Sequence, residues 1–243
     1  PMKSDPVYRH LLLMLVADRK SFHDLIPVIT DLPLDDLIMG DTEVEEVFAR
    51  VRIKEIHGNR YLDANTLTRL PGNYSIMNAI QNFIDNRIAF GLTYLDIDNF
   101  KSFNDKYGFA RGDDMIRMTA RILTNVIKRL CPEKGFIGHI GGDDFVFIVL
   151  AEAAEECCKQ VIQNFDLVSS TLSDDEDRLR GFIETEDRQG KMQRFPLPSV
   201  SLSVIDTRQT QILHPGEASA IASELKKVVK KMPGSNYMIN RRS

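Results

Sequence analysis

The chain has 243 residues, enough for one large or two small domains, and its hydrophobic content of 43% is sufficient for a packed core. The formal net charge of -4 provides no global basic surface, so the sequence predicts no nucleic-acid partner. No apolar run is long enough to cross a bilayer, and the three cysteines lack metal-ligand spacing, so we expect a cytoplasmic protein without membrane contact within this chain.

The N-terminal segment, residues 1–60, is predicted to be separate from a larger domain at residues 61–243. Residues 10–17 predict a buried strand, and the stretches before residue 57 also contain two helical patterns, at residues 21–32 and 42–56. The polar, turn-rich stretch 57–65 marks the predicted boundary. Residues 33–53 weakly resemble the end of a two-component receiver domain; the alternative is a helical linker. An upstream sensory or receiver domain is an expected partner.

Helix and strand patterns follow one another through the larger domain. Helices with one apolar face are predicted at residues 75–84, 113–130, 151–165 and 217–232. Strands are predicted at residues 91–97, 136–140, 145–150, 199–205 and 237–239. An additional β-hairpin is expected at residues 181–196, either as an edge feature without chemistry or as a partner or dimer contact. This order predicts an α+β domain with a mostly antiparallel sheet covered by helices.

Acidic residues gather at the ends of two of these strands. Asp96 and Asp98 close the apolar run at residues 91–97, and Asp143 and Asp144 follow two glycines in a predicted hairpin turn. If the strands are neighbours, Asp96 and Asp143 converge on one site. Carboxylates held that close repel one another unless a cation lies between them, and Mg²⁺ shared with phosphate is the usual solution.

Four motifs carry a resemblance to a known family. They are LTRLPGN at residues 67–73, DIDNFKSFND at 96–105, GFARGDD at 108–114 and GGDDF at 141–145. In this order and spacing they resemble the GGDEF family, the diguanylate cyclases that join two GTP molecules into cyclic di-GMP, over roughly residues 63–240. The resemblance implies a nucleotide-cyclase, palm-like (ferredoxin-like) fold, GTP as substrate, Mg²⁺ or Mn²⁺ as cofactor, and a homodimer in which each subunit supplies one GTP.

The resemblance also implies roles for individual residues. Asp96, Asp143 and the backbone carbonyl of Ile97 would bind the metal ion, and Asp143 and Asp144 would be catalytic. Asn104 and Asp113 would contact the guanine edge, because a carboxylate can accept from the hydrogens on N1 and N2 that adenine lacks. Asp113 also has a competing structural role as the N-cap of the following helix. The remaining residues implied to bind GTP are Phe100, Lys101, Gly141, Gly142 and Lys230 or Lys231.

The sequence departs from the family pattern at four positions. Asp144 stands where the family has Glu, Ser235 where it has an arginine that contacts phosphate, and His139-Ile140 where it commonly has Arg-Tyr. The primary expectation is a diguanylate cyclase weakened by Asp144 and Ser235. The alternative functions are a degenerate domain that binds GTP as a regulatory module without turnover, and a scaffold that binds a partner.

Two charged runs are expected to be solvated surface. One is the acidic run at residues 173–177. The other is the lysine-rich face of the last helix, comprising Lys226, Lys227, Lys230 and Lys231, of which one is expected to do more.

Overall fold

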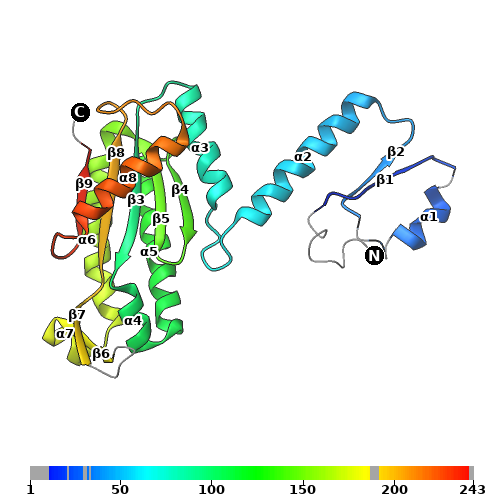
Figure 1. Cartoon of the computed structure of the whole chain (residues 1–243). Coiled ribbons are helices and arrows are strands. Elements are labelled where there is room, and N and C mark those ends of the chain that lie inside the picture. Colours follow the sequence, from blue (N-terminus) through cyan, green and yellow to red (C-terminus); the bar gives the residue numbers. More distant parts are fainter. Residues whose placement is uncertain (1–10, 21, 30–31, 33, 187–191, 241–243) are drawn as a thin grey trace. The chain divides into compact units, whose positions relative to one another are not determined.

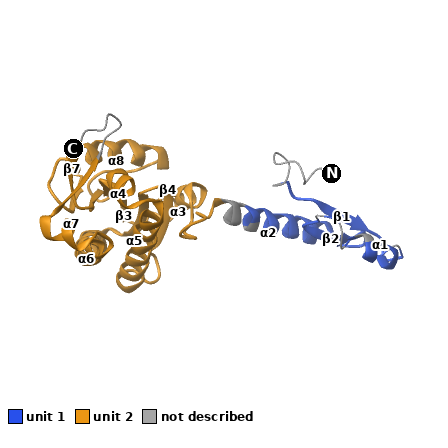
Figure 2. Cartoon of the chain, turned by 90° about the horizontal axis from the view of Figure 1, so that it is seen from below, with its two compact units in different colours: residues 1–62 blue, residues 63–243 orange. Residues whose placement is uncertain are grey.

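The computed structural model describes residues 11–20, 22–29, 32, 34–186 and 192–240 of the chain. The chain divides into two compact units, Pro1–Leu62 and Asp63–Ser243, which Figure 2 distinguishes by colour. No helix among the described residues is long and apolar enough to cross a membrane.

The first unit contains a small parallel sheet and two helices. Strand β1 (Met14–Ala17) pairs with β2 (Asp36–Met39), and α1 (Phe22–Ile29) lies between them in the chain. The predicted buried strand at residues 10–17 is therefore shorter than expected, and only Ala17 in it is buried, whereas Val16 is 64% exposed. His10, at the start of that prediction, lies outside the described residues. The receiver-like interpretation of this unit stays a prediction.

Helix α2 (Val44–Asp63) corrects the predicted turn at residues 57–65. Gly58 costs a helix only about 1 kcal/mol relative to Ala, which does not end a helix of 20 residues. The carboxylate of Asp63 accepts hydrogen bonds from the backbone N–H groups of Gly72, Tyr74 and Ser75 at 2.8–3.0 Å. Asp63 therefore caps the next helix, α3 (Asn73–Asp85), whose N-cap residue is a glycine without a side chain.

The second unit is built on a five-stranded sheet with the order β4-β5-β3-β8-β9. All neighbouring pairs are antiparallel except β8 and β9, which are parallel. The predicted α+β class with a mostly antiparallel sheet is confirmed. The strands are β3 (Phe90–Asp98), β4 (Phe136–Gly141), β5 (Asp144–Leu150), β8 (Ser199–Asp206) and β9 (Asn236–Ile239).

Helices cover both faces of this sheet, and in Figure 1 α8 (Pro215–Val229) crosses in front of it. Leu92 of β3 packs in a cluster with residues of α3 and α8, whereas Leu95 and Ile97 pack with residues of α5 (Phe109–Leu130) and α6 (Ala154–Ser169). Because successive side chains of a strand alternate between faces, Asp96 and Asp98 lie on the same face as Leu92. The acidic end of β3 therefore faces the side of the sheet that α8 covers.

A smaller substructure follows α6 and the 3-10 turn Ser170–Leu172. It consists of α7 (Asp175–Arg180) and the antiparallel hairpin of β6 (Phe182–Glu186) and β7 (Met192–Pro196), whose predicted turn lies outside the described residues. The acidic run at residues 173–177 is not simply solvated surface: Asp177 is only 2% exposed. Its carboxylate accepts short hydrogen bonds from the Tyr107 hydroxyl and the Arg180 guanidinium, which compensate the charge on burial.

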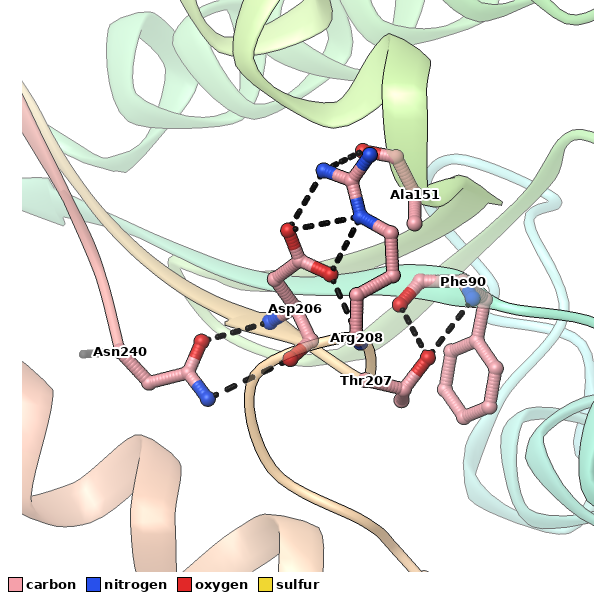
Figure 3. Close-up of polar contacts among 6 residues, drawn as sticks. All are labelled: Phe90, Ala151, Asp206, Thr207, Arg208 and Asn240. Atoms are coloured by element: carbon pink, nitrogen blue, oxygen red, sulfur yellow. Dashed lines mark hydrogen bonds and ion pairs between the residues drawn. The ribbon is translucent and has the colours of Figure 1, made fainter. Parts of the chain in front are cut away.

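A polar network closes the end of the sheet opposite the acidic end of β3, and Figure 3 shows it. Arg208 donates from Nη2 to Oδ2 of Asp206 at 2.6 Å and to the Ala151 carbonyl at 3.2 Å. Asn240 accepts from the backbone N–H of Asp206 at 2.7 Å. Burial alone would raise the pKa of Asp206, but its hydrogen bonds from Arg208 outweigh burial and the pKa is lowered.

Candidate functional site

Two carboxylates face each other across the β3–β5 ladder at the acidic end of the sheet. Asp96 is paired in register with Asp144, so their side chains project from directly opposite positions on the same face. Asp96 is only 6% exposed. Like charges directly opposite in a sheet are destabilising. A positive charge is therefore required between these two side chains.

Two lysines of the α8 region supply that charge. The ammonium group of Lys226 lies 2.6 Å from Oδ2 of Asp96 and 2.8 Å from Oδ1 of Asp144. Lys230 pairs closely with Oδ1 of Asp96 and lies 4.0 Å from Oδ1 of Asp98. Burial acts to lower the pKa of Lys226, but its hydrogen bonds to Asp144 and Asp96 prevail and the pKa is raised. Lys226 therefore stays charged between the two carboxylates.

The expectation that the lysine run is solvated surface is wrong for Lys226. It lies four residues after Ala222, which lies four residues after Ala218, and both alanines are buried against the sheet. Residues at this spacing share one helix face. This spacing, which also brings Lys230 to the carboxylates, is the feature of the sequence that indicates that Lys226 faces the sheet. Lys227 pairs instead with Glu224, and Lys231 is exposed.

Asp98 and Asp143 complete the acidic end of the sheet. Asp98 accepts hydrogen bonds from the hydroxyls of Ser199 and Ser201 at 2.8–3.0 Å. Burial raises the pKa of Asp98 despite these bonds. The pKa of Asp143 is raised first by burial and then by the charge of Asp96. Asp143 adjoins Asp144, which is paired in register with Asp96, so Asp143 lies at the same end of the sheet as Asp96.

The turn that carries Asp143 is made by Gly142 and Asp143, between the paired residues Gly141 and Asp144. Gly142 has a φ of +57°, which glycine adopts without strain. His139 Nε2 lies 3.0 Å from the Gly142 carbonyl, and its Nδ1 lies 3.0 Å from the Thr68 hydroxyl. Because a carbonyl only accepts, Nε2 must donate, and in the neutral ring Nδ1 accepts from Thr68. Burial lowers the pKa of His139 and so favours this neutral form.

The predicted guanine-contact residues lie on α4 (Phe100–Tyr107) and α5. Asn104 approaches Gly112 so closely that a Cβ there would be 1.8 Å from Oδ1 of Asn104. This oxygen is buried and has no hydrogen-bond partner among the described residues. Asp113 lies in the second turn of α5, because the helix begins at Phe109 after Gly108. The competing prediction that Asp113 is an N-cap is therefore wrong.

Phe100 and Lys101, two of the residues implied to bind GTP, lie in the first turn of α4. Asn99, with a φ of +59°, turns the chain from β3 into α4, which begins at Phe100 and leaves Lys101 exposed. The Ile97 side chain packs into the core on the face opposite Asp96. The Ser235 hydroxyl donates to Asp166 in a short contact and accepts from the backbone N–H of Val200 at 3.0 Å. Ser235 thus fixes the chain before β9.

The donor set suits a hard divalent cation. No group of three or more His, Cys, Asp or Glu side chains is preassembled around a metal position in the described part of the chain. However, Mg²⁺ commonly binds through one or two carboxylates together with substrate phosphates and water. Oδ1 of Asp96 is buried, and its charge partner among the described residues is the Lys230 ammonium, which a phosphate could take over. The residues present therefore fit a cation that arrives with a phosphate ligand.

Comparison with known families identifies the domain that carries this site. Residues 63–178 match the family model described as diguanylate cyclase, GGDEF domain. The predicted resemblance is confirmed over these residues. The match includes all four aspartates of the site and ends before the lysines of α8.

Several proteins are similar to this chain. Signaling protein YkoW of Bacillus subtilis (strain 168) is 29% identical over 167 residues, 62% of this chain and 19% of that protein. Diguanylate cyclase DgcN of Escherichia coli (strain K12) is 32% identical over 136 residues, 51% of this chain and 31% of that protein. The chain thus spans about a fifth to a third of the length of these relatives.

Solved structures agree with the fold. The GGDEF domain of DgcB from Caulobacter crescentus in complex with c-di-GMP has a TM-score of 0.52 at 21% identity, and the likeness covers 73% of this chain and 95% of that one. The structure of the coiled coil and GGDEF domain of the same protein has a TM-score of 0.55 at 19% identity, covering 90% of this chain and 100% of that one. At these identities the likeness shows the fold alone.

Proposed function

We propose that the domain is a diguanylate cyclase, which condenses two GTP molecules into cyclic di-GMP and releases pyrophosphate. The observation that carries the proposal is the position of Asp96 opposite Asp144, with Asp143 in the adjoining turn. In each half-reaction a 3′-hydroxyl oxygen bonds to the α-phosphorus of the other GTP, and the bond to pyrophosphate breaks. Both changes need positive charge and fixed carboxylates at one place.

Each residue of the site has a proposed part in this reaction. Asp96 and Asp143, with the Ile97 carbonyl, would hold Mg²⁺ or Mn²⁺, which when bound activates the hydroxyl and neutralises the leaving group. Asp144 is proposed to accept the hydroxyl proton. Lys230 would bind phosphate, because its ammonium group already lies at the reacting end. In the order of the chain, the proposed phosphate contacts also include Phe100, Lys101, Gly141 and Gly142.

Base recognition is assigned to the α4–α5 junction. Oδ1 of Asn104 is buried without a partner among the described residues, so a donor on guanine would relieve an unsatisfied group. Asp113 is half-buried nearby in the sequence and carries a carboxylate able to accept from the N1 and N2 hydrogens. Since each subunit would hold one GTP, turnover requires two copies of this domain.

The test is incubation of the purified protein at high concentration with GTP and Mg²⁺, followed by chromatographic detection of cyclic di-GMP. We expect product from the wild type, none from Asp143→Ala, and unchanged product from the control Lys227→Met, whose lysine is paired with Glu224 only on the surface. Absence of product from the wild type would contradict the proposal.

A second candidate function is a regulatory domain that binds GTP without turnover. The pairing of Asp144 with Lys226 favours it, because the carboxylate expected to take the proton is already occupied. Tight Mg²⁺-dependent GTP binding without product would support this alternative. Restoring the longer side chain with Asp144→Glu distinguishes an impaired enzyme, which gains turnover, from a site that has lost its activity.

A further inference from the structure

We propose that Lys226 is a built-in counter-ion that bridges Asp96 and Asp144 and competes with a divalent cation for Asp96. This inference deepens the proposed function and rests on it only in assigning the cation to catalysis. It starts from the ladder, which places Asp96 and Asp144 directly opposite each other. Two carboxylates so placed must share a cation or repel.

The ammonium group of Lys226 satisfies both carboxylates at once. Its Nζ atom lies at hydrogen-bond distance from Oδ2 of Asp96 and Oδ1 of Asp144, 2.6 and 2.8 Å respectively. Asp96 is also one of the two carboxylates to which the proposed function assigns the divalent cation. Two positive charges held at one carboxylate repel each other, so the ammonium group and a divalent cation compete for Asp96.

The count of charges leads to the same conclusion. Asp96, Asp98, Asp143 and Asp144 carry up to four negative charges, and Lys226 and Lys230 return two positive ones. With half of the charge already neutralised by the chain, a divalent cation gains less from entering the site. The ammonium group of a lysine makes no fixed bidentate contact with a carboxylate. Lys226 can therefore leave these carboxylates more easily than an arginine could.

The order of binding follows from this competition. A cation alone must displace Lys226 and leave its ammonium without a partner, whereas a cation bound to a triphosphate brings phosphate oxygens that can take the ammonium in exchange. The site therefore accepts the metal together with the nucleotide and binds the metal alone weakly. Ala222, Lys226 and the C-cap residue Lys230 follow one another at intervals of four residues along α8. This spacing places both lysines on the face of the helix that lies against the sheet.

The test measures binding of Mn²⁺ alone to the full chain, by electron paramagnetic resonance and by titration calorimetry. We expect Lys226→Met to bind Mn²⁺ about tenfold more tightly than the wild type, because one competing partly buried charge is removed. Lys226→Arg keeps the charge and should bind Mn²⁺ no more tightly than the wild type does. Lys227→Met, one residue along on the exposed face, is the matched control and should change nothing.

Folding is checked in the same variants. Lys226→Met leaves the two carboxylates unneutralised, so its melting temperature should be lower without metal and should rise with Mn²⁺ by more than that of the wild type. Equal or weaker Mn²⁺ binding by Lys226→Met, or no binding in any variant, would overturn the inference. None of these readings depends on turnover, so a protein that makes no cyclic di-GMP could still pass or fail this test.

Discussion

Two buried aspartates at opposite ends of the same sheet differ in how their charge is held. Asp96 and Asp206 are each 6% exposed. Asp206 is fixed by Arg208, which donates to both carboxylate oxygens and to the Ala151 carbonyl, as Figure 3 shows. Among the described residues, Asp96 has lysine ammonium groups as its charge partners, Lys226 at Oδ2 and Lys230 at Oδ1.

The difference shows that burial of a charge does not by itself mark a functional residue. A guanidinium is planar and holds a carboxylate in two places, whereas an ammonium is a point charge that can be exchanged for another cation or a phosphate. The end of the sheet that contains Asp206 is therefore a structural network whose charged groups are paired with each other. At the end that contains Asp96, the lysine partners of the carboxylate can be replaced by ligands.

The largest effect should come from Asp96→Asn, which keeps the shape and removes the charge. If metal binding contributes several kcal/mol to the transition state, cyclase activity should fall on the order of 10³-fold. The free energy of unfolding should change by about 1 kcal/mol or less, because the Lys226 and Lys230 side chains are 35% and 40% exposed and can turn to water. Product formation and urea unfolding measure the two quantities. A stable but active variant would remove Asp96 from the mechanism.

The converse pattern is expected for Asp206→Asn. Loss of the charge partner of Arg208 should lower the free energy of unfolding by about 2–3 kcal/mol, while activity per folded molecule stays within about twofold of the wild type. Because the pKa of Asp206 is lowered in the fold, its stabilisation is present above the unfolded pKa of about 3.9 and is lost as the pH falls through the folded value. Unfolding curves at several pH values check this. A loss of activity without a loss of stability would break the comparison.

The sequence was sufficient for the acidic end of the sheet and insufficient for its counter-ions. Strand alternation and a two-glycine turn place Asp96 and Asp143 together, because both signals are local. The charge of Lys226 predicts that its side chain is exposed to solvent. Its four-residue spacing from the buried Ala222 predicts instead that it faces the sheet, and the sequence alone does not decide between the two. Only the register of β3 with β5 shows why a charge belongs there.

Long-range partners account for the other differences between sequence and structure. Asp177 lies in an acidic run whose composition predicts a solvent-exposed surface. In the fold, however, Tyr107 and Arg180 donate hydrogen bonds to its carboxylate. Gly108, with a φ of +82°, ends α4 and lets α5 begin before Asp113, so a good N-cap residue is used elsewhere. The relation between Thr68 and His139 joins positions 71 residues apart and leaves no local pattern.

Asp177 is a third buried aspartate and sharpens the comparison, because it has structural partners but lies beside α4, the helix of the proposed base contact. Asp177→Asn should lower the free energy of unfolding by about 1–2 kcal/mol and raise the KM for GTP a few-fold with little change in kcat. The Tyr107 hydroxyl, whose pKa burial and Asp177 raise to about 12, remains a donor. The hydrogen bond from Tyr107 lowers the pKa of Asp177, so the stability difference from the wild type should be full above about pH 4 and shrink as the pH falls further.

The matched control is Asp175→Asn on the same helix, whose side chain is 85% exposed and paired with Arg178. It should change the free energy of unfolding by less than about 0.5 kcal/mol. Equal effects of the two substitutions in urea unfolding would mean that burial of Asp177 is irrelevant to its contribution.

The smallest effect expected of a site variant concerns the uncharged hydrogen bond between Thr68 and His139, next to the turn that carries Asp143. Thr68→Val removes the hydroxyl that donates to His139 and leaves a buried acceptor unpaired, at a cost of about 1 kcal/mol. His139 would then hold the Gly142 carbonyl less firmly, and because that carbonyl and the N–H of Asp143 belong to one planar peptide, Asp143 would be less well oriented. We expect kcat to fall several-fold with KM unchanged, and Thr68→Ser to behave as the wild type. If Thr68→Val lowers stability but leaves kcat intact, the contact belongs with the structural network around Asp206 and not with the site around Asp96.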